Sequence, residues 1–494
     1  MFKIIGTISG LTLISRVLGF IRDVFIANFL GAGFLTDCFV AAFRLPNLFR
    51  RIFAEGALSA AFIPIYTGKL SEDKEKSTVF AQEVFSVLIV ALIVLTVVAE
   101  IFMPYIVKAI AVGFDAEKVR ITTQIARITF PYLIFISLVA LFGGILNSLH
   151  KFAAFAAAPI ILNLCLIASF FVFGEITPTY AHSLALGAFV AGILQFAWVY
   201  FYARRSGICI TPKMPKITND IRKLFSRMFP VIIGGSVAQL NLVIDTILAS
   251  TFAGGVSYLH FAERLFQLPI GVIGVAIGTA ILPMLSRHVG NGDKEKYTAT
   301  QNKALELGLF FALPAMVGLM LLAEPIITVL FEHGKFTAVE TMKAFPALIA
   351  YSTGLPAIIL VKIFLPSFFA NHDTKTPVKI GVFCLVLNVV LNLILMQFYA
   401  HVGLAIATAI TSWINAILMG MALKKRGLLS VHTTTFRRIA KFVFATIVMS
   451  VAVWLTSIYL TDFSKIVLLV GSVAIGGTVF IGLVFALDRG VFRK

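Results

Sequence analysis

Eight cationic residues occupy stretches of this chain that are otherwise apolar: Arg16, Arg22, Arg44, Arg50, Arg51, Arg127, Arg264 and Lys362. An arginine at the centre of a bilayer costs about 2.5 to 3.5 kcal/mol, whereas a leucine there contributes only about 0.3 to 0.6 kcal/mol. Nearby carboxylates are too few to neutralise Arg16, Arg22, Arg50, Arg51 and Arg264, so we predict that these side chains bind an anion. The planar guanidinium donates two parallel hydrogen bonds and therefore suits phosphate in particular.

The spacing of charges between residues 34 and 66 predicts how some of them are held. On an ideal helix of about 100° per residue, a polar stripe within about 40° contains Asp37, Arg44, Arg51 and Glu55. Pro46 bends or breaks this helix, so the alignment is approximate on either side of it. This geometry separates the two adjacent arginines of the anion-binding set. Arg51 lies one turn from Glu55 and is therefore reassigned a structural role, whereas Arg50 projects elsewhere and is predicted to meet the ligand.

The arginines of two further apolar stretches lead to different predictions. In the first apolar stretch, Arg16 and Asp23 are seven residues apart and nearly co-facial, while Arg22 lies about 120° from Arg16. Arg127 stands near the start of its stretch. We interpret it as a structural ion-pair partner or as a side chain that reaches the membrane interface.

The second half of the chain contributes its own charges. Glu263 and Arg264 stand together in LHFAERLFQLPIGVIGVAIG (259–278), where Gly271, Gly274 and Gly278 permit close helix packing. Lys362 has two interpretations of equal weight, a further cation for the anionic ligand or the partner of an acid.

A separate polar group in the second half could hold a cation. It comprises Asp245, Asn388, Asn392 and Thr408. The two asparagines are four residues apart and share a helix face. Carboxylate, amide and hydroxyl oxygens are ligands for a hard cation such as sodium. Hydrogen bonding between helices explains the same residues at least as well.

The elements that position these residues are membrane helices. The chain is 59% hydrophobic and only 13% charged over 494 residues, with a mean hydropathy of +0.98, which is typical of a polytopic membrane protein. A bilayer core of roughly 30 Å needs about 20 apolar residues. Fourteen spans are predicted: 4–30, 34–66, 79–107, 124–148, 155–176, 180–203, 228–252, 256–286, 304–331, 341–370, 376–398, 401–423, 439–460 and 466–487.

The distribution of charge predicts the orientation of the spans. With a cytoplasmic N-terminus, 27 of the 41 Lys and Arg residues fall in inner loops and tails, six in outer loops and eight within spans. The positive-inside rule therefore places both termini in the cytoplasm. The same asymmetry accounts for much of the net charge of +18, so no nucleic acid partner is expected. The four cysteines form no CxxC pair and predict neither disulfides nor zinc, and no cleavable signal is expected.

Internal similarity predicts a duplication. FIPIYTGKLSEDKEKSTVFAQ (62–82) resembles ILPMLSRHVGNGDKEKYTATQ (281–301), and the segment from 130 resembles the segment from 345. We predict an all-α protein with two pseudo-symmetric six-helix lobes around a central cationic cavity, plus two extra helices. The expected domains are an N-lobe (1–203), a cytoplasmic linker with a basic amphipathic helix (204–227), a C-lobe (228–424) and a final helix pair (425–494). The linker is more simply a tether than a specific lipid site.

Several motifs resemble one known family. SRVLGFIRD (15–23), TDCFVAAFRLPNLFRRIFAEGALSAAFIP (36–64), GVIGVAIGTAILP (271–283), FEHGKFTA (331–338) and DTKTPVKI (373–380) resemble the lipid II flippases of the MurJ (MviN) family, in the MOP exporter superfamily. The resemblance extends over essentially the whole chain. It implies that the essential arginines are Arg16, Arg22, Arg50 and Arg264, and that the acidic positions are Asp37 and Glu263. Gln267 departs from the acid found there in some members.

The resemblance also implies the activity. The expected function is transfer of undecaprenyl-pyrophosphate-MurNAc-pentapeptide-GlcNAc from the cytoplasmic to the periplasmic leaflet of the bacterial inner membrane, by alternating access, for peptidoglycan synthesis. The last two spans would form a groove for the lipid tail. Partners would be this lipid, the phospholipid membrane and cell-wall synthesis proteins. A monomer without a cofactor is expected, driven by membrane potential and with sodium as a candidate coupling ion.

Three alternatives remain, of which one, a scaffold for the cell-wall machinery, leaves the buried arginines unexplained. An exporter of drugs or of another polyprenyl-linked oligosaccharide would share the fold, although exporters of cationic drugs favour acidic cavities. A membrane enzyme acting on the same lipid would need paired carboxylates or a metal at a membrane face. The acidic cluster SEDKEK (71–76) is a mixed-charge loop and does not fit that role. A transporter, and not an enzyme, is therefore predicted.

Overall fold

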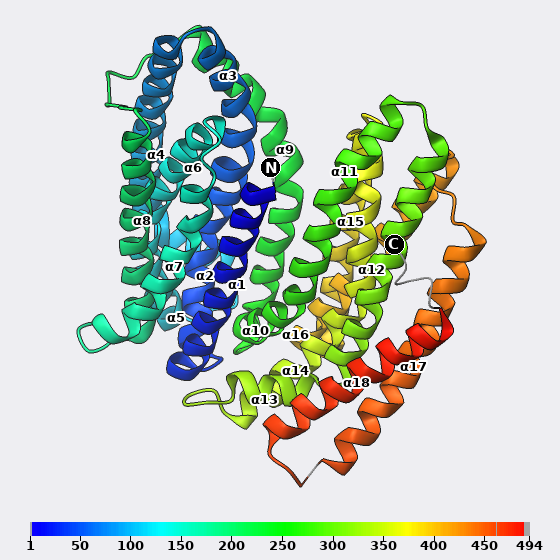
Figure 1. Cartoon of the computed structure of the whole chain (residues 1–494). Coiled ribbons are helices and arrows are strands. Elements are labelled where there is room, and N and C mark those ends of the chain that lie inside the picture. The colour runs from blue at the N-terminus through cyan, green and yellow to red at the C-terminus, as the bar shows by residue number, and fades with distance from the viewer. Residues whose placement is uncertain (1, 461, 489–494) are drawn as a thin grey trace. The chain divides into compact units, whose positions relative to one another are not determined.

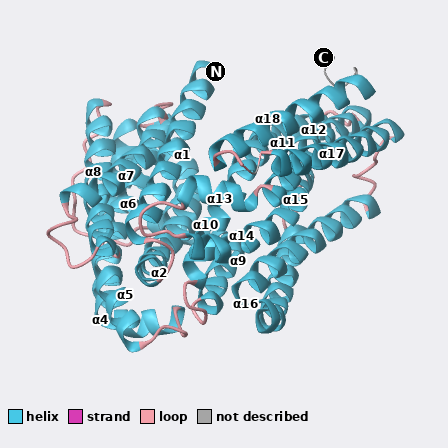
Figure 2. Ribbon diagram, turned by 90° about the horizontal axis from the view of Figure 1, so that it is seen from below, coloured by secondary structure: helices cyan, strands magenta, loops and turns pink. Residues whose placement is uncertain are grey.

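The computed structural model describes residues 2–460 and 462–488; the side chains of residues 2–5, 54–55, 233–238, 275–276 and 279 lie outside that description. Every regular element in the described residues is a helix, as Figure 2 shows. The all-α prediction is confirmed. The chain divides into two compact units, Met1–Ser257 and Tyr258–Lys494.

The first unit contains ten helical elements in the described part of the chain. They are α1 (Phe2–Leu30), α2 (Phe34–Phe49), η1 (Arg50–Leu58), α3 (Ser59–Glu72), α4 (Lys74–Ile110), α5 (Ala116–Thr129), α6 (Tyr132–Ser148), α7 (Ala153–Val172), α8 (Tyr180–Arg205) and α9 (Asn219–Ala249). Helix α1 packs along α7, and α6 along α8 (Figure 1). Because α6 is buried among its neighbours, its residues from Leu138 to Leu146 are all buried.

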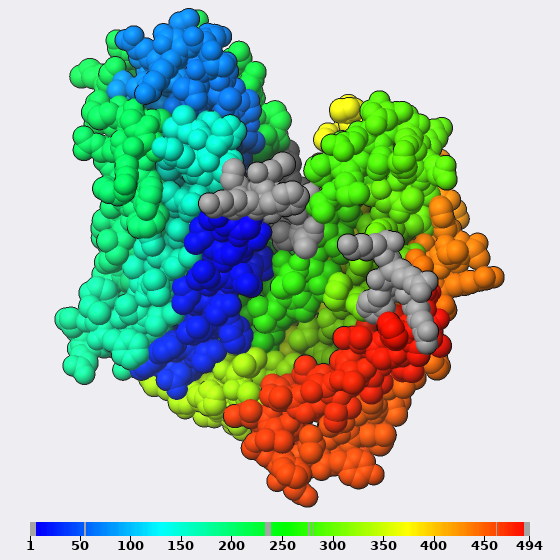
Figure 3. Space-filling model, in the orientation of Figure 1, coloured from blue at the N-terminus to red at the C-terminus, as the bar shows by residue number. Residues whose placement is uncertain are grey.

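The second unit begins within α10 (Gly255–Pro269). The elements that follow are η2 (Ile270–Gly274), α11 (Val275–Gly290), α12 (Lys294–Leu321), α13 (Ala323–Phe331), α14 (Ala338–Thr353), α15 (Leu355–Ala370), α16 (Lys375–Lys425), α17 (Thr433–Tyr459) and α18 (Lys465–Leu487). Helices α17 and α18 run side by side (Figure 1). Phe442 of α17 and Phe480 of α18 bury their rings against Phe310 of α12. Figure 3 shows α18 at the surface of its unit, where apolar side chains such as Val470 and Ile481 are exposed.

Each of the fourteen predicted spans lies mostly on helix, although residues 173–176 and 250–252 extend past the ends of α7 and α9. Eight described helices are long and apolar enough to cross a membrane, or nine if α14 and α15, bent by 40°, form one span. Two predicted spans, 376–398 and 401–423, lie in α16 on either side of a kink at Ala400 (φ 48°, ψ −133°). A multi-pass membrane protein is therefore confirmed, whereas the number of crossings stays a prediction.

Each unit contains a wide helical turn of the π type. Segment η1 follows Pro46, and η2 follows Pro269. A Cβ on Gly56 would lie 2.9 Å from the carbonyl oxygen of Arg51, so glycine permits this close backbone approach. The repeat aligns Pro64 with Pro283, an offset of 219 residues, which maps η1 onto 269–277 and thus onto η2.

The predicted amphipathic linker helix is not a separate element. Residues 219–227 form the first turns of α9 and continue into the following span. Ile221 and Leu224 are buried, whereas Arg222 and Lys223 on the opposite face are exposed. The apolar face is therefore covered by protein. The connection before it is fastened by hydrogen bonds from Lys213 N to Ser86 Oγ and from Thr218 Oγ1 to Glu83.

Candidate functional site

Arg22 is held between α1 and α7. Its Nε and Nη2 both donate to Asp23 Oδ1, at 3.0 and 2.6 Å, and its Nη1 donates to Asn163 Oδ1 at 3.0 Å. Asn163 in turn donates to the carbonyl of Ser15 at 2.9 Å. The Arg22 side chain is 12% exposed. It is thus oriented by a carboxylate and an amide.

Asp37 is clamped at the start of α2. Its carboxylate accepts from Lys118 Nζ at 2.6 Å, from the hydroxyl and the backbone N–H of Ser257, and from the N–H of Gly254. Asp37 is fully buried, and Lys118 is 7% exposed. A buried carboxylate needs this many donors because each unmet oxygen would be costly in an apolar environment. Asp37 therefore joins α2, α5 and the first turn of α10.

The segment η1 interrupts the helix on which a single polar stripe is predicted. Arg44 turns toward α9, where Nη1 donates to the carbonyl of Leu242 at 2.8 Å and to Thr246 Oγ1. Arg50 Nε donates to Asn47 Oδ1 at 3.2 Å. Because a π turn holds more residues than an α turn, the 100° spacing fails after Arg50. Asp37 and Arg44 both precede η1 and meet different neighbours, and a surface shared by all four residues stays a prediction.

The remaining arginines of the first unit are more accessible. Arg16 is exposed, and Asp23, which lies nearly on the same face of the helix, pairs with Arg22. Arg51 is exposed in η1. The side chain of Glu55, its predicted partner, lies outside the described residues. Arg127 lies 3.9 Å from Glu100 and is half exposed, which confirms the ion-pair interpretation.

In the second unit, the predicted pair Glu263 and Arg264 lies half-buried on α10. Gln267 Nε2 donates to Glu263 Oε1 at 2.6 Å, so the residue that departs from the family pattern orients the adjacent acid. Lys362 of α15 passes close to η2. A Cβ on Gly274 would lie 2.4 Å from Lys362 Cδ, so glycine makes room for the lysine stem.

The candidate cation ligands do not all belong to one unit: Asp245 is in the first, and the other three are in the second. Asn392 Nδ2 donates to Asn388 Oδ1 at 2.9 Å, and Asn388 Nδ2 donates to Thr411 Oγ1 at 3.2 Å. The shared helix face of the two asparagines is confirmed, and both are buried. Thr408 donates to the carbonyl of Leu404 within its own helix. Asp245, in the first unit, accepts from Asn241 at 3.4 Å.

Sequence reasoning did not identify two partners of the candidate site residues, Lys118 and Asn163. Lys118 was assigned to an outer loop, but α5 begins at Ala116 and buries it. The signal available was the run DAEK, in which Asp115 caps the new helix and accepts from Lys118 N. Asn163, a single amide in an apolar span, was overlooked because the search followed charge. An amide in a membrane helix is itself a sign of a partner.

Disulfide formation and metal binding are the other chemistries to consider. All four cysteines are free. Among the described residues, no group of three or more His, Cys, Asp or Glu side chains is placed to hold a metal ion. The predicted central cationic cavity stays a prediction.

The fold defines a class. A multidrug resistance transporter of the MATE family and MOP superfamily, solved in an inward-facing conformation, matches with a TM-score of 0.70 at 16% identity over 84% of this chain and 95% of that one. The chain therefore shares the fold of that structure and is a multi-pass helical membrane protein with cations held between apolar helices.

The family follows from closer similarities. The profile described as Lipid II flippase MurJ matches residues 26–474, and the chain belongs to this family. A probable lipid II flippase MurJ from Rhizobium tropici is 39% identical over 98% of this chain and 92% of its own length. The lipid II flippase MurJ of Burkholderia cenocepacia is 35% identical over 87% and 84%. A solved lipid II flippase MurJ, in an inward closed conformation, has a TM-score of 0.86 at 28% identity, with 98% and 99% covered.

Proposed function

We propose that this protein is a lipid II flippase, which moves the undecaprenyl-pyrophosphate-linked disaccharide pentapeptide from the cytoplasmic to the periplasmic leaflet for peptidoglycan synthesis. The observation that carries the proposal is membership of the MurJ family over nearly the whole chain. The cations inside apolar helices supply a physical reason, because a pyrophosphate must be drawn from water into a membrane protein.

We assign a role to each arginine from its contacts and its exposure. Arg22 is oriented by Asp23 and Asn163 and has donors suited to a pyrophosphate oxygen. Arg16 is exposed on the same helix and would give the first electrostatic attraction. Arg50 and Arg264 complete the proposed set of substrate cations. The proposed role of Asp37 is to hold helices together, since its carboxylate is already surrounded by donors.

The direction of transport follows from charge. An anion that leaves a compartment held negative gains about 2.3 kcal/mol per charge per 100 mV. A pyrophosphate with about two charges would gain roughly 4 to 5 kcal/mol at that potential. Export is therefore driven by the membrane potential, and sodium would reset the empty carrier. Alternating access by movement of one half against the other completes the cycle.

The proposed setting is the bacterial inner membrane with both termini in the cytoplasm. This orientation is supported by the excess of Lys and Arg in the loops assigned to the inside. The protein would act as a monomer that receives lipid from the enzymes that make it and delivers it to those that polymerise it. The proposed groove for the lipid tail lies at α17 and α18.

The experiment uses proteoliposomes that contain the protein and fluorescent lipid II. An impermeant reductant bleaches the label in the outer leaflet, and the remaining signal reports transfer between leaflets. We expect bleaching beyond the outer half in the presence of the protein and loss of that effect in Arg22→Ala. Arg127→Ala is the matched control because its guanidinium is half exposed and pairs with Glu100.

Failure to move lipid II would overturn the proposal. Transfer of a different polyprenyl-linked oligosaccharide, with lipid II unmoved, would identify the related exporter. In cells, depletion should leave lipid II accumulated in the inner leaflet. Depletion that prevented synthesis of lipid II would instead indicate an enzyme.

A further inference from the structure

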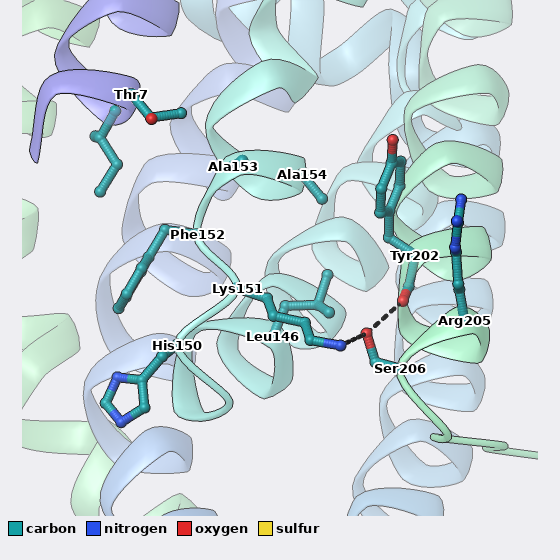
Figure 4. Close-up of a pocket in the computed structure, with 11 residues that line it drawn as sticks. Thr7, Leu146, His150, Lys151, Phe152, Ala153, Ala154, Tyr202, Arg205 and Ser206 are labelled. Atoms are coloured by element: carbon teal, nitrogen blue, oxygen red, sulfur yellow. Dashed lines mark hydrogen bonds between the residues drawn. The ribbon is translucent and has the colours of Figure 1, made fainter. Parts of the chain in front are cut away.

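A cavity of about 550 Å³ lies in the first unit, away from the arginines discussed above. It is bounded by the N-terminal part of α1, the turn between α6 and α7, and the end of α8. Figure 4 shows its residues converging from these three places. Its volume falls within the roughly 300 to 1,000 Å³ usual for small-molecule sites. The proposed function assigns no role to it.

Two helix ends fix the rim of this cavity. At the end of α6, His150 adopts a left-handed conformation (φ 59°), and Lys151 N donates to the carbonyl of Leu146 at 2.9 Å. At the end of α8, Gly207 does the same (φ 77°), and Ile208 N donates to the carbonyl of Ala203. These are Schellman turns, which stop a helix in a defined geometry. The side chains beside them are thereby positioned by backbone structure.

The rim carries positive charge in a prepared arrangement. Lys151 Nζ donates to Ser206 Oγ at 2.9 Å, and Ser206 Oγ donates to the carbonyl of Tyr202 at 2.7 Å (Figure 4). The bond to Ser206 orients the ammonium of Lys151 and leaves it two further N–H donors. Arg205 adds a guanidinium, and none of the eleven described lining residues is acidic. An anion is therefore favoured over a cation or a neutral ligand.

The rest of the lining is apolar or aromatic. Phe152, Ala154 and Tyr202 contribute most plainly to it (Figure 4). Next to Tyr202, Trp198 packs its ring at 4.8 Å and donates from Nε1 to the carbonyl of Ala154. Further along α8, Leu194 and Phe201 are exposed apolar side chains. Aromatic rings beside cations mark the level of lipid head groups, with apolar surface leading toward the acyl chains.

We propose that this cavity binds the phosphodiester head group of an anionic phospholipid from the adjacent leaflet. Lys151 and Arg205 pair with the phosphate, Ser206 holds Lys151 in place, and the acyl chains follow the apolar surface of α8. The charge asymmetry of the loops places this end in the cytoplasmic leaflet, whose surface potential is negative. A membrane lipid supplies both the phosphate and the apolar part that the lining fits, whereas a free phosphate supplies only the first.

The test measures lipid retained by the purified full-length protein. Protein in detergent is titrated with phosphatidylglycerol or phosphatidylcholine and examined by native mass spectrometry. We expect one phosphatidylglycerol to bind about tenfold more tightly than phosphatidylcholine. Lys151→Gln with Arg205→Gln should weaken phosphatidylglycerol binding about 25-fold, since a basic residue near an anionic lipid contributes about fivefold. Arg204→Gln is the matched control, because that guanidinium lies over the ring of Tyr200 outside the cavity.

A second variant tests the cavity itself. Ala153 lines the cavity and is exposed, so Ala153→Phe fills the space without changing charge or burying a new group. Ala153→Phe should abolish the preference for phosphatidylglycerol over phosphatidylcholine. A monodisperse elution profile checks that the variant is folded. Equal binding of both lipids, or unchanged binding in either variant, would overturn the proposal. Inorganic phosphate that binds the lipid-free protein and displaces the lipid at equal concentration would overturn the lipid assignment. Flipping assays address the proposed function separately.

Discussion

Lys118 Nζ lies 2.6 Å from Asp37 Oδ2, and the carboxylate is also bonded by the hydroxyl and the N–H of Ser257. Three helices far apart in sequence therefore meet at one buried negative charge. Removal of one member of such a pair leaves an uncompensated ion in an apolar environment, which costs more than the pair itself contributes.

Replacement of this lysine should therefore destabilise the fold strongly. We predict that Lys118→Met lowers the free energy of unfolding by about 3 to 5 kcal/mol, measured by thermal unfolding in detergent. The double variant Asp37→Asn with Lys118→Met should recover part of this loss, because no buried charge then remains. Lys108→Met, at an exposed position at the end of α4, provides the control. Equal unfolding temperatures for Lys118→Met and Lys108→Met would contradict the prediction.

The amide of Asn163 should matter for transport because it orients Arg22. Asn163→Ala removes the acceptor for Nη1 and the donor to Ser15. A hydrogen bond to a charged group contributes about 1.5 to 3 kcal/mol, so we predict a loss of lipid II transfer of about tenfold or more. Ser169→Ala serves as the comparison, since that buried serine bonds only within α7 among the described contacts. Wild-type transfer rates in Asn163→Ala would show that Arg22 needs no such support.

The two adjacent arginines of η1 should differ in their effect. We predict that Arg50→Ala lowers transfer more than Arg51→Ala, by at least about tenfold, if the loss of one phosphate contact costs about 1.4 kcal/mol. Both variants lose the same charge and nearly the same volume, so each is the control for the other. Dose-response curves of lipid II transfer at matched protein levels give the comparison. A larger defect in Arg51→Ala would reverse the assignment.

Gly274 offers a way to move Lys362 without changing its charge. In Gly274→Ala the new Cβ would meet Lys362 Cδ at 2.4 Å, and the flexible stem must shift, whereas Gly278→Ala meets only a backbone oxygen at 3.9 Å. We predict reduced transfer in the first variant and little change in the second. Lys362→Met then distinguishes the two interpretations of the lysine. Impaired transfer with an unchanged unfolding temperature indicates a substrate cation, and a lowered unfolding temperature indicates an ion-pair partner.

The proposed sodium site can be tested by exchange of the ion. Transfer by the wild type should slow several-fold when sodium is replaced by choline at constant potential. Asp245→Ala should transfer at one rate in both media, because the carboxylate that would attract the ion is gone. A sodium dependence that survives in Asp245→Ala would remove Asp245 from the proposed sodium ligands.

The helices were predictable from the sequence, whereas the partners of the charges were not. Apolar length alone placed the predicted spans, from 4–30 to 466–487, largely on helices, because a bilayer requires long apolar segments. The pairing of Arg22 with Asn163 joins residues 141 positions apart, and no local periodicity reports such a contact. The spacing assumed for the stripe through Arg51 fails at η1, which changes the number of residues per turn. Pro46 indicated a disturbance there, but a proline does not specify which kind.

The two wide turns also carry information about the history of the gene. A π segment is a local expansion of an α-helix, and here η1 and η2 occupy matching places in the two copies of the repeat. Independent expansions at the same place in both copies would require two coincident events. A single expansion in the ancestral half, before it was copied and fused to itself, requires one. On the predicted duplication, the wide turn would be older than the two-unit protein, and the Arg50 and Lys362 neighbourhoods would have diverged around an inherited backbone.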